Sequence, residues 1–323
     1  NPMQPSWQGK ALLKALPLLK SALSVAPFQL AKSATTISDL AARAVFFPVG
    51  KRRGITSWRV GPKLRGERLR PRQKKAQGAI LYLHGGGYLF GSPATHRGLT
   101  ARLADATRCQ VFVPDYRLDP FPAPLEDSLA AFAALTKTTP ANKIIIAGDS
   151  AGGNLTVATL LALAEKGVSP AGGVCFSPWL DLSDKSPDNI KTLHNASSDP
   201  LIPAERIMEA AQLYAGKSAL TNPLVSPVFA SAELMSSLPP LHFSAGSTEV
   251  LLSDSLRFQV PFGLCHLIPT ATRQGCRGAC ACDRLGRHAA RLPGPAQPDA
   301  RSHTIPSSRP LLATLTVVWG ATS

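Results

Sequence analysis

The residues best suited to chemistry in this chain are Ser150 and the glycines on either side of it. Residues 148–152 read Gly-Asp-Ser-Ala-Gly and fit the pattern G-x-S-x-G. In that pattern a serine lies on a turn so tight that only small neighbours fit, and its hydroxyl is exposed. The pattern predicts a nucleophile at Ser150 where a strand precedes the turn and a helix follows it. A simple Gly-Ser turn is the alternative interpretation.

The flanking segments have the character that a nucleophile turn requires. Residues 142–147 (NKIIIA) form a short β-branched run between Pro140 and Gly148, which is typical of a buried strand. Residues 154–166 (NLTVATLLALAEK) are largely apolar and contain neither Gly nor Pro, so they favour a helix. Strand, serine turn and helix therefore follow one another in the expected order.

A glycine run upstream can supply the second part of such a site. His84 is followed directly by three glycines, Gly85 to Gly87. Attack of a hydroxyl on an ester carbonyl produces an oxyanion, which needs hydrogen-bond donors close by. Because glycines let the backbone approach a substrate closely, the N–H groups of Gly85, Gly86 and Ala151 are predicted donors. A phosphate-binding loop is the alternative, but no Lys-Ser/Thr pair follows the glycines.

Strand-like and helix-like segments alternate through much of the chain. We expect strands at residues 78–83, 109–114, 142–147, 172–177 and 238–244, and helices at 96–108, 125–136, 154–166 and 204–215. This alternation predicts an α/β fold with a mostly parallel sheet and helices on both faces. Residues 1–45, which are helical in pattern, and residues 185–222 do not fit the alternation. We expect both to form a helical cap over the core, residues 46–256; surface decorations are the alternative.

Further motifs occur along the chain in one order. They are His-Gly-Gly-Gly-Tyr from His84, Gly-Ser-Pro from Gly91, Asp-Tyr-Arg-Leu from Asp115, Gly-Asp-Ser-Ala-Gly-Gly-Asn from Gly148 and Ser-Pro-Trp from Ser177. With these motifs, residues 1–256 resemble the bacterial hormone-sensitive-lipase-type esterases, which are α/β-hydrolases with an N-terminal and an inserted cap. The resemblance implies a serine carboxylesterase that hydrolyses short-acyl esters through an acyl-enzyme at Ser150, with Gly85, Gly86 and Ala151 forming the oxyanion hole.

The same resemblance implies a carboxylate after the next-to-last strand and a histidine about 30 residues later. Glu249 lies just beyond the expected end of a strand, so we prefer it to Asp254, which falls on the polar face of the following helix pattern. No histidine lies near Ala279, where the resemblance places one. His266 comes too early, and no expected strand precedes His288 or His303.

The composition of the chain changes near Arg257. Residues 258–323 contain no Lys and no Glu, whereas residues 1–256 contain 14 Lys and seven Glu. We interpret residues 257–323 as the product of a reading-frame shift near codon 258, with a natural low-complexity extension as the alternative. If the histidine is absent, the alternative function is a ligand-binding pseudo-hydrolase, as in the gibberellin receptors, which resemble the same family.

The formal charge of +15 does not predict nucleic-acid binding. Residues 257–323 carry eight Arg against two Asp, and the Lys/Arg-rich residues 51–75 are interpreted as a solvated segment. No apolar run approaches the 18 residues or so of a membrane span. We therefore expect a cytoplasmic enzyme of small ester substrates. Serine, histidine and acid need no cofactor or metal, and a homodimer remains one option for the oligomeric state.

Overall fold

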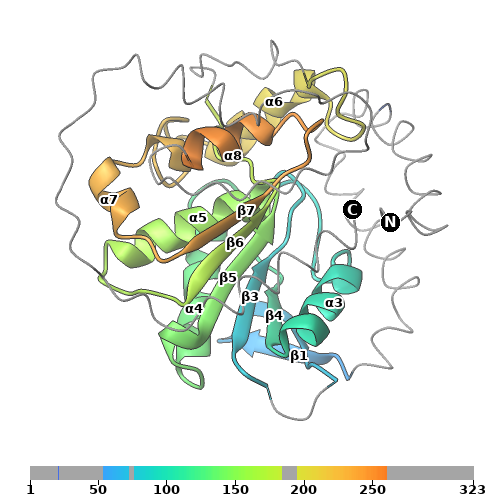
Figure 1. Cartoon of the computed structure of the whole chain (residues 1–323), viewed down its shortest axis with the longest axis vertical. Helices are drawn as coiled ribbons and strands as arrows, with labels where there is room; N and C mark the ends of the chain where they lie inside the picture. Colours follow the sequence, from blue (N-terminus) through green and yellow to red (C-terminus); the bar gives the residue numbers. More distant parts are fainter. Residues whose placement is uncertain (1–20, 22–53, 73–75, 184–194, 260–323) are drawn as a thin grey trace, which may run out of the picture.

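A computed structural model describes Ser21 and residues 54–72, 76–183 and 195–259 of the chain. Within these ranges, seven strands form one sheet in the order β1-β2-β4-β3-β5-β6-β7 (Figure 1). The outer pairs β1–β2 and β2–β4 are antiparallel, and all other neighbours are parallel. The predicted α/β architecture with a mostly parallel sheet is therefore confirmed.

The elements lie close to the predicted segments. The strands are β1 (Thr56–Val60), β2 (Leu64–Leu69), β3 (Ala79–Leu83), β4 (Gln110–Pro114), β5 (Ile144–Asp149), β6 (Gly172–Phe176) and β7 (Leu241–Ser244). The helices are α3 (Arg97–Thr107), α4 (Ala123–Thr136), α5 (Ala151–Ala164), α6 (Ile207–Ala215), α7 (Ala232–Ser236) and α8 (Leu252–Gln259), with the 3-10 turns η2 (Ala141–Lys143), η4 (Ala204–Arg206) and η5 (Pro227–Phe229). Helix α5 begins at Ala151 rather than at Asn154, directly after the serine.

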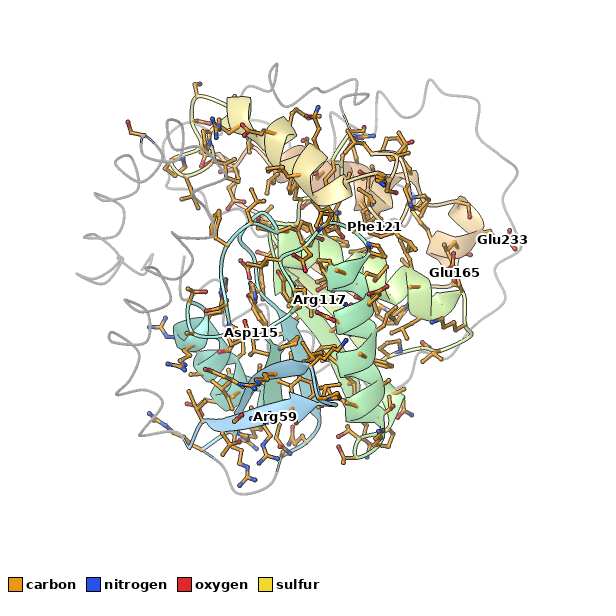
Figure 2. All side chains as sticks on the ribbon, turned by 180° about the vertical axis from the view of Figure 1, so that it is seen from behind. Arg59, Asp115, Arg117, Phe121, Glu165 and Glu233 are labelled. Atoms are coloured by element: carbon orange, nitrogen blue, oxygen red, sulfur yellow. The ribbon has the colours of Figure 1, made fainter. Side chains whose placement is uncertain are left out.

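The hairpin β1–β2 corrects one prediction. Part of the Lys/Arg-rich stretch 51–75, which was interpreted as a solvated segment, forms two paired strands at the edge of the sheet. Trp58 packs edge-on against Phe112 of β4, with ring centroids 5.2 Å apart, while its neighbour Arg59 is exposed (Figure 2). Strand side chains alternate between faces, so in β1 an exposed face that carries Arg59 coexists with a half-buried face that carries Trp58. The many arginines concealed this alternation.

The core occupies both faces of the sheet. Strands β3 and β6 are buried along their whole length, as expected for parallel strands covered by helices. Apolar residues of α4 and α5 pack in one cluster on one face, and residues of α3 pack in another cluster on the opposite face (Figure 1). Helices α7 and α8 contribute Met235 and Phe258 to a third cluster with α5. Full burial of one such side chain contributes roughly 1.5–3 kcal/mol to stability.

The register of the parallel strands brings four loops to one edge of the sheet. Leu83 at the end of β3 lies opposite Gly148 of β5, and Asp149 lies opposite Phe176 of β6. Phe176 in turn lies opposite Ser244, the last residue of β7. The loops that follow β3, β5, β6 and β7 therefore emerge side by side at their carboxyl ends, where open α/β sheets bind their ligands.

The loop after β4 is fixed to helix α4. The backbone N–H of Arg117 donates to Asp127 Oδ2 at 2.8 Å, and its guanidinium donates to both oxygens of the same carboxylate at 2.8–3.1 Å (Figure 2). Such bidentate pairs are among the stronger side-chain interactions.

Among the described helices, none combines the length and apolar character needed to cross a bilayer.

Candidate active site

Ser150 occupies a strained turn between β5 and α5. Its φ of 53° and ψ of −120° are unusual for a residue with a Cβ, and its N–H donates to Phe176 O at 2.9 Å. A Cβ at Gly152 would lie 2.0 Å from Leu83 O, so only glycine fits where α5 passes β3. The strand, turn and helix predicted around Ser150 are confirmed.

The glycine loop after β3 lies beside this turn. Gly86 has a φ of +123°, and a Cβ there would lie 2.0 Å from Phe90 O. Its carbonyl accepts the N–H groups of Leu89 and Phe90 at 3.0 and 3.1 Å. Ala151, at the N-terminus of α5, lies where the helix dipole favours negative charge. The Gly85 N–H, by contrast, already donates to Asp149 Oδ1 at 3.1 Å.

Asp149 links the serine turn to the glycine loop. Besides the Gly85 N–H, it accepts the Tyr82 hydroxyl at 2.6 Å, and its second oxygen lies 3.4 Å from His96 Nε2. Burial alone would raise the pKa of this carboxyl, but His96 and the hydrogen bonds outweigh burial and lower it. Burial likewise opposes the charge on His96, whose pKa is nevertheless raised by Asp149. The carboxylate is therefore held in its ionised form.

His84 is buried and packs beside the glycine loop. Its Nδ1 lies 2.9 Å from Gly85 O, and its ring stacks on Tyr116 with centroids 4.3 Å apart. The Tyr116 hydroxyl donates to His84 O at 2.5 Å. Burial, reinforced by the neighbouring His96, lowers the pKa of His84 to about 3. The ring is thus neutral at physiological pH and packs as part of the scaffold.

Glu249 lies in the loop between β7 and α8, as predicted. Burial raises the pKa of its carboxyl; hydrogen bonds from the Ser177 hydroxyl and the Gly246 N–H partly offset this, and the charge of Asp199 adds to the rise. Ser177 directly follows β6, with its N–H bonded to Ser244 O at 2.6 Å. Glu249 therefore lies at the same edge of the sheet as Ser150, two strands further out.

Asp254 has a different environment. It lies on α8, and its Oδ2 accepts the N–H groups of Leu180 and Asp181 at 2.8 and 2.9 Å. Burial raises its pKa to about 7, while an ion pair joins Arg257 to Asp181 beside it. Its carboxylate is thus used to hold the loop after β6, which supports the preference for Glu249 over Asp254.

Residues 195–222, which we call the cap segment, contact the glycine loop. Tyr214 of α6 stacks on Tyr88, with ring centroids 3.5 Å apart and planes 3° from parallel. The Tyr88 hydroxyl donates to Asn154 Oδ1 at 2.7 Å, and the Asn154 amide donates to Trp179 O and Val225 O at 2.7 and 3.0 Å. In Figure 1, α6 lies beyond the carboxyl ends of the strands.

Sequence reasoning missed three groups at this site. Asp149 was seen only as the variable position of the serine motif, and Ser177 only as part of Ser-Pro-Trp. Asp199, which bonds to the loop carrying Glu249, stands in no motif that would have signalled it. His266, His288 and His303 lie outside the described residues, as do residues 1–20 and 22–45 of the expected N-terminal cap and residues 185–194 of the expected inserted cap.

Known proteins resemble the chain over this region. A family model described as alpha/beta hydrolase fold matches residues 80–260. An acetyl-hydrolase from Streptomyces hygroscopicus is 37% identical over 194 residues, 58% of this chain and 62% of that protein. An esterase from Acinetobacter venetianus is 34% identical over 202 residues, 61% of this chain and 64% of that protein. The chain therefore spans less than two thirds of the length of these relatives.

Solved structures agree with these similarities. An esterase of the bacterial hormone-sensitive lipase family superposes with a TM-score of 0.68 at 28% identity, covering 99% of this chain and 100% of the other. A hormone-sensitive lipase from a metagenome library gives a TM-score of 0.65 at 35% identity, covering 81% of this chain and 85% of the other.

Proposed function

The chain belongs to the α/β-hydrolase family, among the hormone-sensitive-lipase-type esterases, and we propose that it is a serine carboxylesterase of short-acyl esters. The observation that carries the proposal is the strained turn at Ser150, set between a buried strand and a helix N-terminus and beside a glycine loop. Relatives described as esterase and acetyl-hydrolase support the same chemistry.

In the proposed reaction, Ser150 Oγ attacks the ester carbonyl carbon and transfers its proton to a histidine. The tetrahedral oxyanion accepts the N–H groups of Gly86 and Ala151, and the alcohol leaves with the proton. Water then hydrolyses the acyl-enzyme, releasing the carboxylic acid and restoring Ser150. One oxyanion donor stabilises a transition state by roughly 2.7–4 kcal/mol. Gly85 contributes a further donor only if its N–H leaves Asp149.

Glu249 is proposed to orient the histidine and to stabilise its protonated form. Its place after β7, two strands from β5, suits an acid that faces the nucleophile across the sheet edge. The family resemblance places the histidine that would serve as base about 30 residues after Glu249, within residues 260–323, which lie outside the described part of the chain.

Turnover of p-nitrophenyl butyrate by this chain tests the proposal. We expect Ser150→Ala to lower kcat/KM by about 10⁴-fold or more, because the members of a catalytic triad act as a unit. Ser169→Ala is the matched control: it removes the hydroxyl of an exposed residue before β6 and is expected to change the rate by less than about twofold. Equal rates for the chain and Ser150→Ala would contradict an esterase and favour a ligand-binding role.

A further inference from the structure

The loop that carries Glu249 is bonded to the cap segment as well as to the sheet. Residues 246–250, which we call the acid loop, form hydrogen bonds with three residues of the cap segment, Asn195, Ser198 and Asp199. We call these three residues the clip. They stand 50 to 54 residues before their partners in the chain, so only the folded cap segment brings them there.

Asp199 is the most buried member of the clip, with 3% of its surface exposed. Its Oδ2 accepts the Val250 N–H at 2.9 Å, directly after Glu249. Its Oδ1 accepts the N–H groups of Leu201 and Ile202, each at 2.8 Å. The carboxylate of Asp199 thus joins the backbone at residues 201 and 202 of the cap segment to the acid loop. Charge-assisted bonds of this kind are about twice as strong as neutral ones.

Asn195 and Ser198 bind the carbonyl groups of the same loop. The Asn195 amide donates to Ser247 O at 3.2 Å and to Glu249 O at 2.9 Å. The Ser198 hydroxyl donates to Thr248 O at 3.1 Å. The clip therefore engages four consecutive residues, 247 to 250, through main-chain groups, which constrains the backbone independently of the side chains that the loop carries.

We propose that Asn195 and Asp199 are positioning residues for Glu249: the cap segment holds the acid loop in the conformation that the acid needs. The catalytic part of this inference rests on the proposed function. The same cap segment stacks Tyr214 on Tyr88 of the glycine loop. One inserted segment therefore contacts both loops on which the proposed chemistry depends, and displacing it misaligns the acid.

The charge of Asp199 affects the pKa of Glu249, which is a measurable effect that a purely structural role of Asp199 would not produce. The described groups that act on Glu249 are Asp199, the Ser177 hydroxyl and the Gly246 N–H. Asp199 raises the pKa of Glu249 because two nearby negative charges oppose each other. Asp199→Asn removes that charge and keeps an acceptor oxygen. We expect it to shift the acid limb of the pH–rate profile towards lower pH.

Amide hydrogen exchange of the purified chain tests the clip without requiring turnover. In Asn195→Ala and Asp199→Ala, we expect exchange in residues 246–252 to rise about tenfold, since one hydrogen bond contributes roughly 0.5–1.5 kcal/mol. The matched control is Asn222→Ala. Asn222 also lies in the cap segment, but its side chain bonds only to Ser218 and Leu224 within the described residues. It should leave exchange in residues 246–252 unchanged.

Steady-state kinetics on the same variants test the catalytic consequence. For Asn195→Ala we expect kcat to fall about tenfold while KM changes less than about twofold, because the acid acts in the transition state. Unchanged exchange in residues 246–252 in both clip variants would overturn the inference. The inference would also be overturned if exchange became faster in the clip variants but Asp199→Asn left the pH–rate profile of an active enzyme unchanged. If the unsubstituted chain shows no esterase activity, that result contradicts only the proposed function. Hydrogen exchange in the clip variants still tests whether the clip holds the acid loop.

Discussion

The two halves of the candidate site are held in different ways. On the nucleophile side, Asp149, the last residue of β5, joins Ser150 to the glycine loop, and the serine turn and the loop follow the adjacent parallel strands β5 and β3. On the acid side, the loop carrying Glu249 follows the last described strand of the sheet and is fastened by a segment inserted far upstream. The nucleophile side is thus built into the sheet, whereas the acid side depends on the docking of the cap segment. Substitutions in the two halves should accordingly differ in whether they reduce activity or stability.

On the acid side, the largest effect is expected from loss of the Glu249 charge. Glu249→Gln keeps the shape of the side chain but removes its charge, so a histidine oriented by it loses both its tautomer and its electrostatic support. We expect kcat for p-nitrophenyl butyrate to fall by about 10⁴-fold, with the melting temperature little changed. Asp254→Asn should retain turnover within about tenfold, because Asp254 holds a loop. A larger loss for Asp254→Asn than for Glu249→Gln would reverse the assignment of the acid.

Asp254 should instead control stability as a function of pH. Its folded-state pKa of about 7 lies above the ordinary value of 3.8, so the folded chain binds more protons than the unfolded chain between these pH values. Stability therefore falls as pH rises from about 4 to about 7, by up to roughly 4 kcal/mol. Asp254→Asn should flatten this slope in urea unfolding at several pH values. The exposed Asp119→Asn should preserve it, and an unchanged slope in Asp254→Asn would contradict the assignment.

On the nucleophile side, the sheet framework leaves no room for change. In Gly152→Ala the new Cβ would lie 2.0 Å from Leu83 O, so α5 must move away from β3. We expect a loss of about 3 kcal/mol in urea unfolding, typical of severe overpacking. Gly167→Ala is the control: its φ is +67°, but no described atom lies within 4 Å of the added carbon. It should lose only about 1 kcal/mol from backbone strain. Equal losses would show that the close approach is not the cause.

The smallest effect is expected where the two halves meet. Tyr88→Phe removes the hydroxyl that donates to Asn154 at 2.7 Å but keeps the ring that stacks on Tyr214. We expect a loss of about 1 kcal/mol in chemical unfolding, the net value of one buried hydrogen bond. A loss above about 3 kcal/mol would indicate that the hydroxyl, rather than the stacked rings, anchors the cap segment to the glycine loop.

The same contrast explains what could be predicted from the sequence. The serine turn was predictable because Ser150 needs small neighbours and a strand–turn–helix setting, all of which are visible within 25 residues or so. Glu249 was predictable only through its position after a strand and a family resemblance. The clip was not predictable, because Asn195 and Asp199 act through backbone groups more than 50 residues away. Strands β1 and β2 were missed because arginines such as Arg59 and Arg65 occupy their exposed face.

The most direct test of the central claim is covalent labelling of the nucleophile. Ethyl p-nitrophenyl butylphosphonate reacts when a serine oxygen displaces p-nitrophenolate at phosphorus, which leaves a stable phosphonyl ester on that serine. After incubation of the purified chain, tandem mass spectrometry should place the adduct on Ser150, with no adduct in Ser150→Ala. A chain that remains unlabelled, or that carries the adduct on another residue, would contradict the account.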